Sequence, residues 1–199
     1  MRGITTFYPM DRFLEKGMKC GVIGIGGLGH MAIMFLKKMG YEVTAFTSSN
    51  KKTEMIKDLG VDHIIISSDK DQMKKAENSL DFIINTIPTN ALFNEYVKCC
   101  QKGAFFIQLG VPVGEKGGLT VQADQVACKE ITIFGGAVGP RKSIEKMLKL
   151  CAEKNIYPLS EEFSFEDWPK AFEKLEHGQP HFRCIVNVKD FAEKKGWKK

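Results

Sequence analysis

The feature that most constrains the fold of this sequence is a glycine-rich turn set between a short apolar run and a helical pattern. Residues 19–23 read KCGVI, and the following Gly24, Gly26 and Gly29 have the spacing Gly-x-Gly-x-x-Gly. After the turn, apolar residues recur at helical spacing on one face: Leu28, Met31, Ala32, Phe35, Leu36 and Met39. Gly40 then stands where a helix would end. The sequence therefore predicts a strand, a tight turn and a helix.

The spacing of the three glycines has a mechanical meaning in such a unit. Gly24 permits the tight turn, Gly26 lets the backbone approach a pyrophosphate, and Gly29 lets the helix and the strand pack closely. Phosphates would lie at the helix N-terminus, where backbone N–H groups and the helix dipole favour anions. We therefore predict a dinucleotide-binding turn. The alternative is a glycine-rich connection that binds nothing.

The chain continues as an alternation of apolar strands and helices up to residue 154. After the first strand, further strands are predicted at 41–46, 63–66, 80–87, 103–109 and 131–134, and helices at 28–39, 51–59, 72–78, 91–100 and 141–154. These strands are near-continuous apolar runs, as expected where helices cover both faces of a sheet. The pattern predicts an α/β Rossmann fold with a doubly wound, parallel, six-stranded sheet and a cofactor across the carboxyl ends of the strands.

Two segments of this part depart from the alternation. Residues 1–16 are expected to form a helical prelude that Pro9 breaks, with Phe7, Met10 and Phe13 on one face. Residues 110–129 are expected to form a longer loop with one short edge strand, LTVQ at 119–122.

The pattern changes after residue 154. A short helix at 168–176 and a strand at 184–188 do not continue the alternation. We therefore divide the chain into a nucleotide-binding domain, 1–155, and a short C-terminal α+β segment with a basic tail, 156–199.

Composition excludes several functional classes. The 199 residues carry a net charge of +5, and part of this excess comes from five lysines in the tail 189–199. The rest of the chain has no basic stripe interleaved with aromatic residues, which argues against nucleic-acid binding. The first residues resemble neither a signal peptide nor a presequence, and no run is long enough for a membrane span. The six cysteines lie mostly in apolar runs, which predicts reduced core thiols and a cytoplasmic protein.

The end of the second predicted strand indicates which dinucleotide is bound. Folds of this kind that select NAD usually place Asp or Glu there, to hold the ribose hydroxyls. Here the segment 46–52 reads FTSSNKK, with three hydroxyls, two lysines and no acid. Such a set favours a 2′-phosphate, so we predict NADP(H). The alternative is that Ser49 or Asn50 caps the following helix and that both lysines are solvated.

Three stretches together carry a family resemblance: GITTFYPM at 3–10, GVIGIGGLGHMA at 21–32 and TSSNKK at 47–52. They resemble the cinnamyl-alcohol-dehydrogenase-like branch of the zinc-dependent medium-chain alcohol dehydrogenases, and the likeness extends to about residue 188. Members of this branch transfer a hydride between NADPH and an aldehyde or primary alcohol, with a zinc ion that polarises the carbonyl.

The resemblance implies a set of cofactor contacts. The pyrophosphate would be held by Gly24, Gly26, Gly27, Leu28 and Gly29, and the 2′-phosphate by Thr47, Ser48, Ser49 and Lys52. The nicotinamide side would be formed by Thr5, Thr86, Leu109, Gly110, Val111, Gly136, Ala137 and Val138. Arg183 is a weaker candidate for a cofactor contact.

The sequence departs from the family in what it lacks. Family members carry an upstream catalytic domain with zinc ligands and a four-cysteine zinc lobe, and neither is present in these residues. The last catalytic ligand would fall near Met1, where there is no cysteine, and His30, His63, His177 and His181 lack metal-ligand spacing. We therefore expect no zinc on this chain and no catalytic residue in it.

Two functions remain open. The chain is either the cofactor-binding portion of an alcohol or aldehyde dehydrogenase, inactive by itself, or an inactive Rossmann module that serves as a structural or NADP-binding subunit of an assembly. Trp168, Phe172 and Leu175, with the strand after them, would lack the cover that the catalytic domain gives in the family. We expect a partner protein or a homodimer to cover 156–190.

Overall fold

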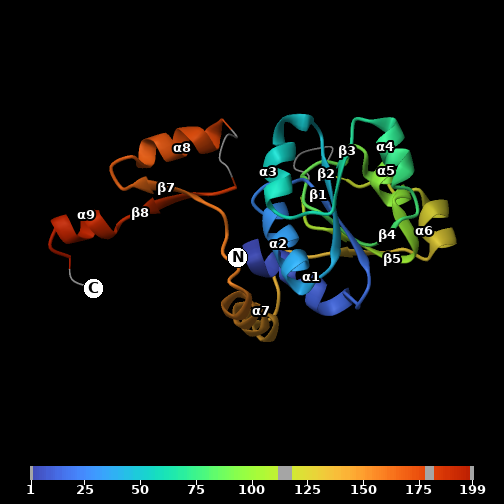
Figure 1. The fold of residues 1–199 in the computed structure, drawn as a ribbon, viewed down its shortest axis with the longest axis horizontal. Helices are drawn as coiled ribbons and strands as arrows, with labels where there is room; N and C mark the ends of the chain where they lie inside the picture. Colours follow the sequence, from blue (N-terminus) through green and yellow to red (C-terminus); the bar gives the residue numbers. More distant parts are fainter. Residues whose placement is uncertain (1, 112–117, 178–181, 198–199) are drawn as a thin grey trace. The chain divides into compact units, whose positions relative to one another are not determined.

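The computed structural model describes residues 2–111, 118–177 and 182–197, and the chain divides into two compact units, Met1–Ile156 and Tyr157–Lys199. The first unit is built on a six-stranded sheet with the order β3-β2-β1-β4-β5-β6, in which every pairing is parallel (Figure 1). The predicted doubly wound parallel sheet is confirmed.

The strands and helices of the first unit alternate as the apolar periodicity predicts. The strands are β1 (Lys19–Ile23), β2 (Glu42–Thr47), β3 (His63–Ile66), β4 (Leu80–Asn85), β5 (Cys100–Gln108) and β6 (Thr132–Gly135). The helices are α1 (Arg2–Phe13), α2 (Gly29–Met39), the 3-10 turn η1 (Asn50–Lys52), α3 (Thr53–Asp58), α4 (Lys70–Lys75), α5 (Phe93–Lys98), α6 (Ala123–Lys129) and α7 (Arg141–Lys154).

Helices cover both faces of the sheet, with α1, α2 and α3 on one side and α4, α5 and α6 on the other (Figure 1). The sheet contributes Phe46, Phe82 and Phe106 to the largest fully buried side chains of the interior, and α2 contributes Phe35. Burial on both faces explains why the strands read as continuous apolar runs rather than as alternating ones.

Pro9 does not break the first helix, which corrects the sequence-based expectation. The helix α1 runs through Pro9 to Phe13. A proline costs one intrahelical hydrogen bond. Here the loss is offset by tertiary packing, because Ile4, Phe7 and Met10 are buried and α1 packs against α2 and α7.

The edge strand expected at 119–122 is also wrong. Residues 118–122 form neither helix nor strand, and residues 123–129, expected as part of the same loop, instead form the helix α6. Leu119 and Val121 pack against the core cluster as single side chains of an extended segment, and Asn94 side-chain atoms hold the backbone of Thr120 and Gln122. The alternating apolar residues therefore reflect packing on the core, not strand pairing.

The second unit is a small α+β arrangement. It contains β7 (Glu161–Ser164), α8 (Trp168–Glu176), β8 (Cys184–Asn187) and α9 (Lys189–Lys194). The strand expected at the C-terminal end is thus paired, because β8 forms a parallel two-stranded sheet with β7. Among the helices of the described residues, none combines the length and the apolar character needed to cross a bilayer.

A partly buried polar contact joins α1 to α7. The Asp11 carboxylate accepts hydrogen bonds from Ser143 Oγ at 2.7 Å and from Lys146 Nζ at 2.7 Å. Burial alone would raise the pKa of Asp11, but the hydrogen bonds from Lys146 and Ser143 and the charges of Lys146 and Lys142 outweigh it and hold the pKa below its ordinary value. The ionised carboxylate therefore stabilises the packing of the two helices.

We expect Asp11→Ala to lower the free energy of unfolding by about 1–3 kcal/mol at neutral pH, because it leaves the buried Ser143 hydroxyl without its acceptor. Since the pKa of Asp11 is lower in the folded chain, its contribution is present at neutral pH and is lost as the pH falls below about 4. Urea unfolding of both proteins across this range measures the effect.

Glu54→Ala is the matched control, because Glu54 forms an exposed ion pair with Lys57. Two results would contradict this role. One is an equal loss of stability in the two variants. The other is a difference in the free energy of unfolding between Asp11→Ala and the unmodified chain that does not shrink in acid.

Candidate functional site: a dinucleotide-binding edge of the sheet

The turn between β1 and α2 has the close packing that its glycines predict. Gly24 has a φ of +81°, in the region that favours glycine. A Cβ at Gly29 would lie 2.0 Å from the carbonyl oxygen of Gly24, so only glycine lets α2 begin this close to the strand. A Cβ at Gly26, in contrast, would meet nothing within 4 Å. The backbone at Gly26 is therefore open to the approach of a ligand.

Thr86, directly after β4, holds this turn from the neighbouring strand. Its hydroxyl lies 2.7 Å from the carbonyl oxygen of Gly24 and 3.0 Å from that of Ile23, and its N–H donates to Ile23. The strand order reverses between β1 and β4, and ligands of open α/β sheets bind outside such a reversal. Thr86 therefore supports the turn at the place where a cofactor would cross the sheet.

A cavity of about 350 Å³ lies at this place. Its lining includes seven of the predicted contacts: Gly24, Gly26, Thr47, Ser48, Ser49, Lys52 and Thr86. The structure thus brings the glycine turn and the polar end of β2 to one cavity. No acidic side chain lines it, and no acid stands in the first turn of α2. The charge of the cavity suits an anion.

Helix capping does not occupy the hydroxyls at the end of β2. Ser49 stands at the N-cap of η1, but its side chain makes no capping hydrogen bond. Thr47 Oγ1 donates to the carbonyl of Ser49 at 3.3 Å, which bends this segment around the cavity. The capping interpretation of Ser49 is therefore not realised in the fold.

The aromatic wall of the cavity was not identified from the sequence. Tyr96, on α5, lines it, packs edge to face on Phe46 and donates its hydroxyl to Ser67 Oγ at 2.9 Å. Burial raises the pKa of Tyr96, so its hydroxyl stays protonated and keeps this bond. The helical pattern of α5 predicts only that Tyr96 faces the core, not that it reaches the end of β2.

Of the residues expected on the nicotinamide side, Thr86 lines the cavity and Thr5 lies on α1, while the other six follow the carboxyl ends of β5 and β6, outside the lining. Gly110 packs against the backbone after β4, because a Cβ there would lie 2.0 Å from the carbonyl oxygen of Ile87. Thr5 Oγ1 donates to the carbonyl of Ala137 at 2.5 Å, which joins α1 to the loop after β6. The neighbouring residues of these two loops are Leu109, Val111, Gly136 and Val138.

Two of the predicted pyrophosphate contacts, Gly27 and Leu28, lie between the cavity and α2, with Leu28 at the N-cap position. Arg183 lies in the second unit, where its carbonyl accepts from the N–H of Glu161. Its proposed cofactor contact stays a prediction.

Two further polar side chains at this edge were missed. Asn85 ends β4 and Gln108 ends β5; they are register partners, and their amides are hydrogen bonded at 2.8 Å. The sequence offered one signal for them: two apolar runs, FIIN and FFIQ, each end in a polar residue.

The donor set of the described residues does not fit a zinc ion. Across 2–111, 118–177 and 182–197, no three His, Cys, Asp or Glu side chains gather closely enough to hold a metal. Burial raises the pKa of Cys20, Cys99 and Cys100 to about 12, so these thiols stay protonated, whereas zinc takes the thiolate. His181 lies outside the described residues.

The cysteines only partly match the expected core thiols. Cys20, Cys99 and Cys100 are buried, but Cys128 is exposed, and Cys151 and Cys184 are partly exposed. All six are free thiols.

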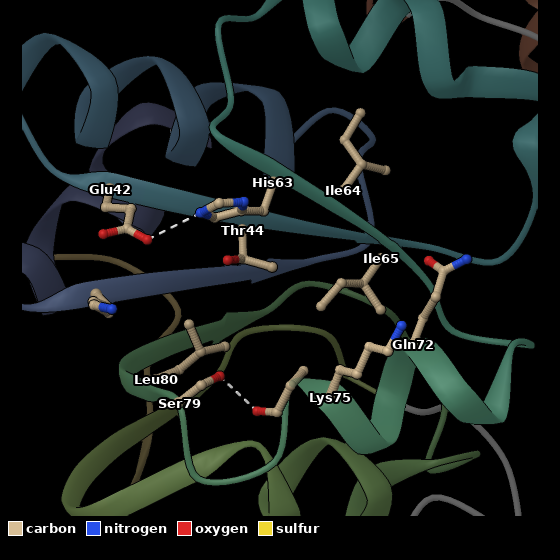
Figure 2. Close-up of a pocket in the computed structure, with 11 residues that line it drawn as sticks. Glu42, Thr44, His63, Ile64, Ile65, Gln72, Lys75, Ser79 and Leu80 are labelled. Atoms are coloured by element: carbon tan, nitrogen blue, oxygen red, sulfur yellow. Dashed lines mark hydrogen bonds and ion pairs between the residues drawn. The ribbon is translucent and has the colours of Figure 1, made fainter.

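A second cavity of about 480 Å³ lies at the opposite, amino edge of the sheet (Figure 2). Lys19, Glu42 and His63, the first residues of β1, β2 and β3, line it. Figure 2 shows that polar groups there pair within the protein: His63 Nε2 lies 3.0 Å from Glu42 Oε1, and Ser79 Oγ donates to the carbonyl of Ala76. It is the larger of the two cavities, but no glycine turn or open helix N-terminus of the described residues lines it.

The comparison with known proteins agrees with the geometry of the carboxyl edge. The family model described as zinc-binding dehydrogenase matches residues 27–153. A putative cinnamyl alcohol dehydrogenase of Oryza sativa is 34% identical over 191 residues, and cinnamyl alcohol dehydrogenase 5 of Arabidopsis thaliana is 34% identical over 189 residues. Each alignment covers 94% of this chain and 53% or 52% of the relative.

Solved structures give the same result. A cinnamyl alcohol dehydrogenase of Sorghum bicolor has a TM-score of 0.85, and one of Helicobacter pylori, solved in complex with NADP(H), has a TM-score of 0.81. Both are 29% identical to this chain, and the match covers 94% of it and 53% of the other chain.

The chain thus spans about half the length of these relatives. That half is the one with the glycine turn and the doubly wound sheet. The chain belongs to the zinc-binding dehydrogenase family and corresponds to the nucleotide-binding half of its cinnamyl-alcohol-dehydrogenase-like members.

Proposed function

We propose that this chain is the NADP(H)-binding portion of an alcohol or aldehyde dehydrogenase. One observation carries the proposal: the glycine turn after β1 and the acid-free, hydroxyl- and lysine-bearing end of β2 line one cavity. The H. pylori relative, whose structure holds NADP(H), supports the choice of dinucleotide.

The residues of the site would hold the cofactor by complementary groups. The glycine turn would receive the pyrophosphate on backbone N–H groups at the start of α2, while Ser48, Ser49 and Lys52 would receive the 2′-phosphate. The loops after β5 and β6 would lie along the nicotinamide end, since a dinucleotide crosses the sheet at its carboxyl edge. When bound, the cofactor would supply or accept a hydride.

Activity requires groups that the described residues do not bring together. Family members use zinc to polarise the carbonyl, and the donor set here does not fit zinc. We therefore propose that this chain is inactive by itself. The alternative is a structural or NADP-binding subunit of a larger assembly, and a cytoplasmic location stays a prediction.

We also propose that a partner surface or a second copy covers the second unit. Trp168, Phe172 and Leu175, on one face of α8, are 52%, 52% and 55% exposed. Trp168 and Phe172 pack edge to face, so they form a contiguous patch rather than scattered side chains. Such patches usually mark an interaction surface.

We expect the chain to bind NADPH at least about tenfold more tightly than NADH in calorimetric titration. The double variant Ser48→Asp/Lys52→Ala should reverse this order, because the carboxylate repels the 2′-phosphate and accepts hydrogen bonds from ribose hydroxyls.

Lys51→Ala is the control for a general loss of positive charge. Lys51 neighbours Lys52 in η1 but does not line the cavity, so its removal should leave the preference within about twofold. Equal affinities of the unmodified chain for the two cofactors would refute the assignment of the β2 end.

The isolated chain should not oxidise primary alcohols with NADP⁺, even with zinc added, because nothing in the described residues would stabilise the developing alkoxide. Spectrophotometric detection of NADPH is the assay, and bound NADPH detected by fluorescence is the control for a folded protein. Zinc-dependent turnover would show that the proposal of inactivity is wrong.

The double variant Trp168→Ser/Phe172→Ser should reduce the oligomeric size measured by light scattering or abolish capture of the partner. Leu148→Ser, which removes an exposed apolar side chain from α7, is the control for a loss of apolar surface elsewhere. An unchanged size and solubility for the double variant would argue against an interface on α8.

A further inference from the structure

We propose that Asn85 and Gln108 are a positioning pair that sets the backbone on which the nicotinamide end of the cofactor lies. The proposal rests on the proposed NADP(H) binding. Neither side chain is among the cofactor contacts that the family resemblance implies, and neither lines the cavity at the end of β2.

The two amides form one continuous chain of hydrogen bonds across the sheet edge. The N–H of Ile87 donates to Asn85 Oδ1 at 3.2 Å, Asn85 Nδ2 donates to Gln108 Oε1 at 2.8 Å, and Gln108 Nε2 donates to the carbonyl of Gly110 at 2.6 Å. The chain therefore joins the loop after β4 to the loop after β5.

The two ends of this chain fix the orientation of both amides. A backbone N–H can only donate and a backbone carbonyl can only accept. Asn85 must therefore turn its oxygen to Ile87, which leaves its NH₂ for Gln108, and Gln108 must turn its NH₂ to Gly110. A carboxylate at position 108 would lack the donor that the last bond needs.

The backbone that the pair holds has little freedom of its own. The N–H groups of Leu109 and Gly110 donate to the carbonyl of Asn85, and a Cβ at Gly110 would lie 2.0 Å from the carbonyl oxygen of Ile87. Asn85 is 1% exposed, so water does not replace a lost bond easily. A defect in the pair should therefore move the two loops relative to each other.

This role is confined to one end of the cofactor. The 2′-phosphate end would contact the end of β2, two strands away from β4 in the sheet order. Breaking the pair should weaken the binding of the nicotinamide end of the cofactor and leave the binding of its adenosine end unchanged. Adenosine 2′,5′-bisphosphate, which has no nicotinamide, is the probe that separates the two.

The first experiment compares Gln108→Met with Gln101→Met in calorimetric titrations of NADPH and of adenosine 2′,5′-bisphosphate. Both glutamines lie on β5 and both lose a side-chain hydrogen bond, but Gln101 bonds Asp81 at the other end of the strand. We expect Gln108→Met to lower the affinity for NADPH about tenfold and to change the affinity for the bisphosphate less than about twofold. The variant should also reduce the rise in fluorescence when NADPH binds. Gln101→Met should leave both affinities unchanged.

The second experiment uses Gln108→Glu as a pH-dependent rescue. When ionised, the carboxylate of this variant cannot donate to the carbonyl of Gly110. When protonated, the same carboxyl group donates through its O–H and accepts from Asn85 with its other oxygen. Dividing the NADPH affinity by that of the bisphosphate cancels the titration of the 2′-phosphate, and comparing this ratio with that of the unmodified chain at the same pH cancels the titration of the probe's 5′-phosphate. This ratio should be low at about pH 8 and rise toward that of the unmodified chain at about pH 6, because burial raises the pKa of a carboxyl.

The outcomes separate the pair from the proposed function. Should the unmodified chain bind neither probe, NADP(H) binding itself fails. Should it bind both while Gln108→Met and Gln108→Glu keep the normal ratio at every pH, the positioning role is overturned. If Gln108→Met does not fold, the ratio for Gln108→Glu decides alone.

Discussion

The closeness of α2 to the first strand is the constraint on which the rest of the site depends. Because Gly29 has no side chain, the helix begins against the carbonyl of Gly24, and Thr86 contacts the same carbonyl from the next strand over. One carbonyl therefore positions a helix N-terminus, a tight turn and the end of β4 together. A larger residue at position 29 would push these three elements apart, and with them the surface proposed to receive the pyrophosphate.

The carboxyl edge of the sheet is held by neutral hydrogen bonds rather than by ion pairs. Thr86, Asn85, Gln108 and Tyr96 each bond either a backbone group or another uncharged side chain. Buried polar groups need such partners, and a network of uncharged groups provides them without the desolvation cost of burying charges. Lys52, an exposed charge that lines the cavity, takes no part in this network.

The order of the elements could be predicted from sequence because apolar period and glycine spacing are local properties. The run at β1 and the stripe on α2 indicate a strand and a helix without knowledge of any partner. The end of β2 could be assigned a charge preference for the same reason. The turn after β1 and the end of β2 are also the parts of the site that line one cavity.

What could not be predicted depends on contacts between distant segments. Pro9 stays helical because other helices pack on α1, and residues 118–122 stay outside the sheet because Asn94 holds them. Asn85 and Gln108 look like ordinary polar ends of strands until the register between β4 and β5 brings them together. Their position at strand ends is a local signal, but their pairing depends on two strands that α5 separates in the sequence, so the pair emerges only from the fold.

The contact of α1 with α7 has a consequence for the order in which this unit can fold. The bonds of Asp11 to Ser143 and Lys146 span 132 and 135 residues, and the apolar side chains Ile4, Phe7 and Met10 of α1 are buried in the finished unit. During synthesis, all six strands and α7 must therefore be made before the packing of α1 is complete. Contacts of such sequence separation slow folding, so the side of α1 that faces α7 is among the last parts of this unit to be packed.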